Sequence, residues 1–126
     1  MSGGVKSYRD LLVWQKGMDL SAEVYRLSRE WPKEEMFGLT SQARRAATSI
    51  PANIAEGYGR QSTASYSHFL KTARGSLMEL ETHLLIAERV GLATPGTYAD
   101  VLERADELGR MIGGLIRSIN QKGLDR

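Results

Sequence analysis

Five polar side chains share one face of the segment RRAATSIPANIAEGYGR, which spans residues 44–60. Their spacings of four, four, three and four place them, in an α-helix of about 100° per residue, within a strip roughly 80° wide. They are Arg45, Ser49, Asn53, Glu56 and Arg60. Guanidinium, carboxylate, amide and hydroxyl groups on one face can hold a polar ligand or form hydrogen bonds to a neighbouring helix. We favour bracing between helices, and keep ligand binding as a second use of the strip.

A second polar strip of the same width follows in the next segment of the chain. Its members are His68, Thr72, Ser76, Glu79 and His83. Both strips lie beside an apolar stripe, so their side chains are expected to be partly buried and to need partners. If the two segments form antiparallel helices, Arg45 lies level with Glu79, and we expect a charge-assisted pair between them. Ser49 then faces Ser76.

The carboxylates and histidines of these strips raise the question of a metal site. Di-iron bundles use Glu-x-x-His on two helices and further glutamates on the others, and Glu-x-x-His occurs nowhere in the chain. Glu56 is expected to pair with Arg60 in its own helix. We therefore expect no metal and no cofactor, and keep as an alternative a metal-binding enzyme that uses Glu56, Glu79 and His83.

Several other classes of protein leave signatures that this chain lacks. It has no Gly-x-Ser-x-Gly elbow, no P-loop and no cysteine, so we expect a protein that is not an enzyme. No apolar run approaches the ~20 residues that cross a bilayer. The N-terminal segment MSGGVKSYRD has no hydrophobic signal core. We therefore expect no membrane contact and a cytoplasmic location.

Basic residues are concentrated in one part of the chain. The formal net charge is only +2, but residues 36–78 hold five basic residues and one acid. Such an asymmetry favours an anionic partner, and we expect contacts with the phosphates of RNA or DNA. The expected contact residues are Arg44, Arg45, Arg60, Lys71 and Arg74.

These residues must be positioned by helices, because the apolar residues repeat at helical spacing and no segment alternates like a strand. We predict helices at about 8–30, 40–58, 62–90 and 95–121, with Thr94 and Pro95 at the start of the last. Apolar residues at alternating spacings of three and four in the last two predict coiled-coil-like packing. Short connections then give an all-α, up-down-up-down antiparallel four-helix bundle, a single domain over residues 1–126. Pro51 is expected to kink the second helix, with Ser49 and Asn53 bonding the freed backbone groups.

The first predicted helix carries two apolar stripes on opposite faces, of which one bundle can bury only one well. The first stripe consists of Leu11, Trp14, Met18, Ala22 and Tyr25. The second consists of Val13, Leu20, Val24, Leu27 and Trp31. A large exposed apolar stripe usually marks an interface. We expect the second stripe to form contacts between copies in a homo-oligomer.

The segments LTSQARRAATSIPANIAEGYGR (39–60) and FLKTARGSLMELETHL (69–84) carry two motifs that resemble a known family. The first motif, Ser-x-Pro-x-Asn-Ile-x-Glu-Gly, falls at Ser49, Pro51, Asn53, Ile54, Glu56 and Gly57. The second, Gly-Ser-x-x-Glu-Leu-Glu, falls at Gly75, Ser76, Glu79, Leu80 and Glu81. The chain resembles the bacterial four-helix-bundle proteins encoded in intervening sequences of 23S rRNA genes. The resemblance implies a bundle that assembles into a homopentamer.

A related bundle is the accessory protein of diversity-generating retroelements, which engages reverse transcriptase and nucleic acid. The expected function is therefore a non-enzymatic, pentameric scaffold or accessory protein associated with RNA or DNA, with a reverse transcriptase as one kind of partner. The alternative is an adaptor that binds only proteins.

Overall fold

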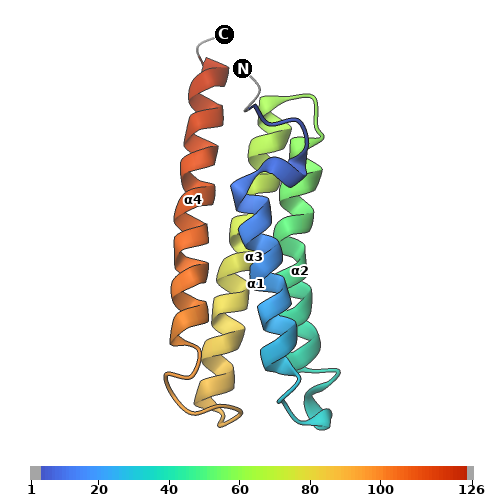
Figure 1. Ribbon diagram of the computed structural model, residues 1–126, viewed down its shortest axis with the longest axis vertical. Helices are drawn as coiled ribbons and strands as arrows, with labels where there is room; N and C mark the ends of the chain where they lie inside the picture. The colour runs from blue at the N-terminus through green and yellow to red at the C-terminus, as the bar shows by residue number, and fades with distance from the viewer. Residues whose placement is uncertain (1–3, 125–126) are drawn as a thin grey trace.

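The computed structural model describes residues 4–124, which form a bundle of four long helices (Figure 1). The elements are η1 (Tyr8–Asp10), α1 (Leu12–Ser28), η2 (Lys33–Glu35), α2 (Leu39–Tyr58), α3 (Thr63–Arg89) and α4 (Ala99–Leu124), where η denotes a short 3-10 helix. Successive long helices run in opposite directions. The predicted all-α, up-down-up-down bundle is confirmed. No helix in the described part of the chain is long and apolar enough to cross a membrane.

The core lies where the apolar stripes of all four helices meet. In α3 the buried positions follow the predicted repeat, from Leu70 through Leu77 and Leu80 to Leu84. In α4 Ile112 is fully buried on the matching stripe. α2 packs against α1 and α3, and α4 packs against α3 and α1. α1 and α3 make no close backbone approach among the described residues, so they are diagonal across the bundle.

The last helix begins later than its sequence suggests. Thr94 and Pro95 do not start α4, which begins at Ala99. The reason is Gly96, whose φ of +89° is left-handed and cannot continue a right-handed helix. The backbone N–H of Tyr98 then donates to Glu88 Oε2 at 2.9 Å, which ties the connection to the end of α3. The first helix ends at Ser28 instead of Glu30, and the last ends at Leu124 instead of residue 121. The other predicted bounds differ by no more than one residue or by the separate turn η1.

The apolar stripe assigned to an interface lies instead in the core of the bundle itself. Its members Val13, Leu20, Val24 and Trp31 are buried and Leu27 is partly buried. Trp31 Nε1 also donates to the buried Tyr98 hydroxyl at 2.8 Å. The expectation that this stripe is exposed and available to another copy is therefore wrong. The opposite stripe faces outward, with Met18 45% exposed and Tyr25 41% exposed.

Small residues explain why α1 turns this face inward. Gly17 and Ser21 lie on the buried face, where a Cβ on Gly17 would be 3.5 Å from side-chain atoms of Ile50 and Pro51. The close approach of α1 to α2 therefore needs small side chains on α1. The opposite face carries bulky residues such as Trp14 and Met18, which cannot approach a neighbouring backbone as closely.

α2 continues through Pro51, and the structure shows how its backbone tolerates the proline. Pro51 has no N–H for the carbonyl of Ala47. The hydroxyl of Ser21 on α1 donates to this carbonyl at 2.7 Å, in a buried position. Asn53 Nδ2 donates to the Ser49 carbonyl at 2.8 Å. The prediction that Ser49 and Asn53 bond the acceptor freed by Pro51 is therefore wrong, because Ser21 of another helix already satisfies that carbonyl.

The energetic contribution of the Ser21 hydroxyl should depend on the presence of Pro51, and the variant Ser21→Ala tests this. Ser21→Ala leaves the buried Ala47 carbonyl without a donor and is expected to lower the free energy of unfolding by about 1–3 kcal/mol. In a Pro51→Ala background the backbone N–H of residue 51 can serve that carbonyl, so the same change should cost about 1 kcal/mol less. Urea unfolding of the four proteins in this cycle measures the difference. Strictly additive effects would contradict the proposed pairing.

Candidate functional site

A chain of hydrogen bonds crosses the seam between α2 and α3. Ser49 Oγ lies 2.8 Å from Ser76 Oγ, as the antiparallel register predicts. Asn53 Nδ2 donates to the same Ser49 Oγ at 2.9 Å. All three side chains are partly buried, so each hydrogen bond is shielded from water. The centre of the polar strip therefore does brace the two helices.

The ends of the strip behave differently from its centre. Arg45 and Glu79 do not form the expected ion pair. They lie on a groove of about 300 Å³ between α2 and α3, together with Gln42, Ala46, Ser49 and Ser76. Glu79 Oε2 lies instead 3.8 Å from His83 Nε2, one turn further along α3. The expected pair is wrong because an ion pair between exposed side chains contributes little, so Glu79 gains little from reaching across the groove.

Glu56 and Arg60 form the expected pair within α2 and the turn that follows it. Arg60 Nη2 lies 2.7 Å from Glu56 Oε2, and the guanidinium also stacks 4.8 Å from the centre of the Phe69 ring. Nearby, Gly57 is buried against α3. Glu56 is thus engaged with an arginine and not directed at His83.

His83 is buried, and within residues 4–124 neither of its ring nitrogens has a hydrogen-bond partner. Among the described residues, no group of three or more histidines and acids is placed to hold a metal ion. The set Glu56, Glu79 and His83 therefore does not converge on one point in the described structure.

The five expected phosphate contacts are not on one surface. Arg44 lies toward α1, where Nε donates to Ser28 Oγ at 2.8 Å and the guanidinium lies 4.7 Å from the centre of the Tyr25 ring. Arg60 is neutralised by Glu56. The remaining three, Arg45, Lys71 and Arg74, form no ion pair with any carboxylate within residues 4–124.

Arg74 faces a groove of about 340 Å³ between α3 and α4, which brings in a residue that the sequence pattern did not indicate. This residue is Arg117 of α4, which also lines the groove and also forms no ion pair in the described part of the chain. A sequence feature that could have pointed to this groove is the set of glycines in α4 at positions 109, 113 and 114, which leave part of the helix surface without side chains. At the far end of the groove, burial raises the pKa of Glu81, and the charge of Asp106 raises it further.

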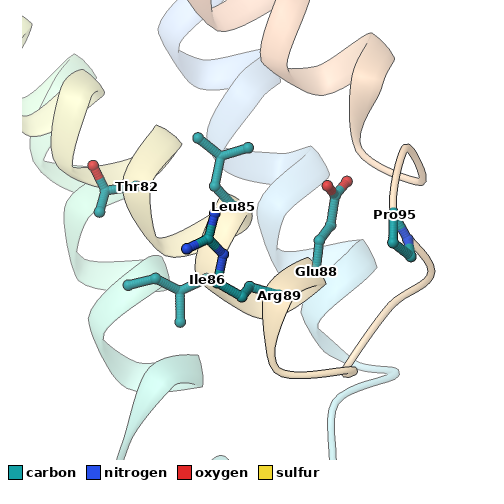
Figure 2. Close-up of a pocket in the computed structure, with 6 residues that line it drawn as sticks. All are labelled: Thr82, Leu85, Ile86, Glu88, Arg89 and Pro95. Carbon is teal, nitrogen blue, oxygen red and sulfur yellow. The ribbon is translucent and has the colours of Figure 1, made fainter.

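Two apolar surfaces lie on opposite sides of the bundle. One is a groove of about 410 Å³ formed mainly by Tyr8, Trp14, Met18, Ala22 and Tyr25, with Pro51, Ala52 and Ala55 of α2. The other is on α3, where a hollow of about 420 Å³ is lined by Thr82, Leu85, Ile86, Glu88, Arg89 and Pro95 (Figure 2). Leu85 is 52% exposed, and Met78, Ile86 and Val90 nearby are also exposed. Neither surface resembles a catalytic centre, because carbon atoms dominate both.

Comparison with known proteins identifies a family and a solved structure of similar fold. The family described as 23S rRNA-intervening sequence protein matches residues 9–114. A solved structure from Bacteroides thetaiotaomicron, described as a protein of unknown function from the S23 ribosomal protein family, superimposes with a TM-score of 0.77. The two chains are 24% identical over 83% of this chain and 98% of the other, so this likeness concerns the fold. No curated protein gives a significant match.

Proposed function

Because the chain belongs to the 23S rRNA-intervening sequence protein family, we propose that it is a non-enzymatic scaffold that assembles with copies of itself and binds the phosphates of RNA or DNA. The observation that carries the proposal is the uneven pairing of charges around the bundle. Within residues 4–124, Arg45, Lys71 and Arg74 of α2 and α3 form no ion pair. By contrast, Arg26 of α1 and Arg104 and Arg110 of α4 each pair with a carboxylate of their own helix.

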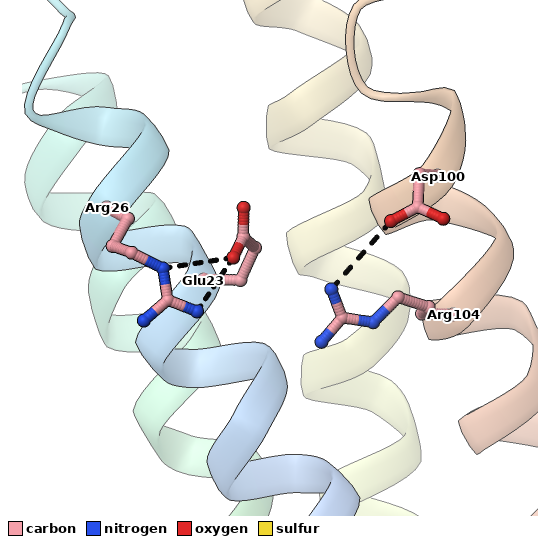
Figure 3. A network of polar contacts seen from close by, with 4 residues as sticks. All are labelled: Glu23, Arg26, Asp100 and Arg104. Carbon is pink, nitrogen blue, oxygen red and sulfur yellow. Dashed lines mark hydrogen bonds and ion pairs between the residues drawn. The ribbon is translucent and has the colours of Figure 1, made fainter.

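Figure 3 shows two arginines, on α1 and α4, that each form an ion pair with a carboxylate. On α1, Arg26 Nη2 lies 2.7 Å from Glu23 Oε1, and on α4, Arg104 Nη1 lies 3.9 Å from Asp100 Oδ2. Each arginine thus meets a carboxylate of its own helix, and its charge is largely cancelled at a distance. Arg45 and Lys71 are exposed and carry no such partner among the described residues. Phosphates can take the place of the missing carboxylates.

Salt dependence of nucleic-acid binding tests this part of the proposal. With fluorescently labelled single-stranded RNA and duplex DNA, affinity is expected to fall steeply with salt. The double variant Arg45→Gln and Lys71→Gln should lower the slope of log K against log salt by about 0.7–0.9 for each phosphate that is no longer neutralised. Arg26→Gln is the matched control and should leave the slope unchanged.

Two results would contradict nucleic-acid binding through these residues. One is the absence of measurable binding to either probe at low salt. The other is an equal effect of the double variant and of Arg26→Gln. The first result would favour an adaptor that contacts only proteins.

We also propose that self-association uses the two exposed apolar surfaces. They are on the diagonal helices α1 and α3, and they differ in shape and residues. Two different complementary surfaces on opposite sides of a molecule make a head-to-tail contact, which closes into a ring when the rotation between copies allows it. The family resemblance implies a ring of five. Light scattering that shows only monomers at micromolar concentration would contradict this proposal.

A further inference from the structure

Two arginines on different helices converge on one glycine. A Cβ built on Gly113 of α4 would lie 3.3 Å from Arg74 Nη1 and 3.6 Å from Arg117 Nη1. Arg74 comes from α3 and Arg117 from the turn of α4 that follows Gly113. The two guanidinium groups therefore occupy the same small space above the bare backbone of α4.

No carboxylate of the described residues forms an ion pair with either arginine. The acids of the same groove, Glu81 and Asp106, are each seven residues from Arg74 or Gly113, or about 10 Å along a helix. Asp106 is also paired with Arg110. Two like charges thus approach each other without a counter-charge, an arrangement that an anion between them would stabilise.

Gly113 has a specific reason to lack a side chain. Glycine inside a helix is less favourable than alanine, so its presence needs a compensating gain. At Gly109 a Cβ would be 3.3 Å from Leu77 Cδ2, so that glycine allows α3 and α4 to pack. At Gly113, apart from the backbone of α4, the atoms of the described residues within 4 Å of the added Cβ belong to the two guanidinium groups. The space above Gly113 is therefore occupied by the two cations.

We propose that Arg74 and Arg117 form a clamp that binds one phosphate group in the groove between α3 and α4. A guanidinium presents paired N–H donors that match two phosphate oxygens, so two of them can hold a single phosphate from both sides. Lys71 lies one turn before Arg74 and adds another positive charge to the same part of α3. The phosphate can belong to a nucleic-acid backbone, in which case the clamp rests on the proposed function, or to a free phosphate or mononucleotide.

The test follows the Nε–Hε resonances of the arginines by NMR while inorganic phosphate or a single-stranded oligonucleotide is added. We expect the Arg74 and Arg117 signals to shift with either probe and not with the same ionic strength of chloride. Arg74→Gln and Arg117→Gln should each weaken oligonucleotide binding by about tenfold or more. Arg110→Gln, in the same groove but paired with Asp106, is the control and should change it little.

Gly113→Ala separates binding from folding. The added methyl should stabilise the helix against unfolding, because alanine is the better helix former. It should nevertheless weaken phosphate binding by displacing the Arg74 guanidinium, whose Nη1 lies 3.3 Å from the added Cβ. An oligonucleotide that binds without shifting the Arg74 and Arg117 signals would overturn the clamp and leave the proposed function standing. Shifts with inorganic phosphate and no oligonucleotide binding would support the clamp with a free phosphate ligand and contradict the proposed function. No shift with either probe would overturn the clamp.

Discussion

Gly57→Ala is expected to destabilise the bundle by about 3 kcal/mol, at the upper end of the usual cost of overpacking. The added Cβ would lie 2.8 Å from Phe69 Cβ and 3.3 Å from the Tyr66 carbonyl oxygen. Both atoms are on or next to the backbone of α3, so no rotation of a side chain relieves the overlap. α3 must move away from α2, which loosens the packing at this end of their seam. Urea unfolding measures the decrease in stability.

A glycine elsewhere in the same helix pair gives the matched control. Gly75 lies inside α3, is exposed, and has nothing within 4 Å of an added Cβ. Gly75→Ala should therefore stabilise the protein by about 0.5–1 kcal/mol, the ordinary helix preference for alanine. Equal effects of the two substitutions would show that Gly57 is not required for close approach of the helices.

The fold could be predicted because α3 and α4 each carry one continuous apolar stripe. Leu80, Leu84 and Ile112 fall on these stripes and are fully buried. With one stripe per helix, few packing arrangements exclude water from all of them. The same register correctly brings Ser49 to Ser76, since residues at matching heights in antiparallel helices must meet.

The orientation of α1 could not be predicted in this way, because both of its faces are apolar. The choice depends on whether Gly17 and Ser21 fit against α2, which is a property of two helices at once. The bond from Ser21 to the Ala47 carbonyl joins residues far apart in sequence and leaves no local pattern. The expected Arg45–Glu79 pair was also wrong, because an ion pair between exposed side chains contributes about 1 kcal/mol or less and helix register alone does not determine it. Arg117 was missed because it lies outside the basic segment and meets Arg74 only through the fold.

A charge on either exposed apolar surface is expected to reduce the proposed assembly to monomers. Met18→Asp places a carboxylate on the α1 surface, and Leu85→Asp places one on the α3 surface. Burial of an unpaired carboxylate between copies costs several kcal/mol, which exceeds what most single contacts contribute. Met18 is 45% exposed and Leu85 is 52% exposed in the single chain, so each variant should still fold. Ser118→Asp, on an exposed position of α4, is the control and should leave the mass in light scattering unchanged.

A mixture of the two variants then distinguishes a ring from a two-fold dimer. The Met18→Asp chain keeps an intact α3 surface, and the Leu85→Asp chain keeps an intact α1 surface. In a head-to-tail assembly these two surfaces bind each other once, and both remaining surfaces carry a charge, so growth stops at a heterodimer. A two-fold dimer through α1 alone would instead be broken by Met18→Asp and unaffected by Leu85→Asp. Light scattering of the mixture should therefore show twice the monomer mass if α1 of one copy binds α3 of the next.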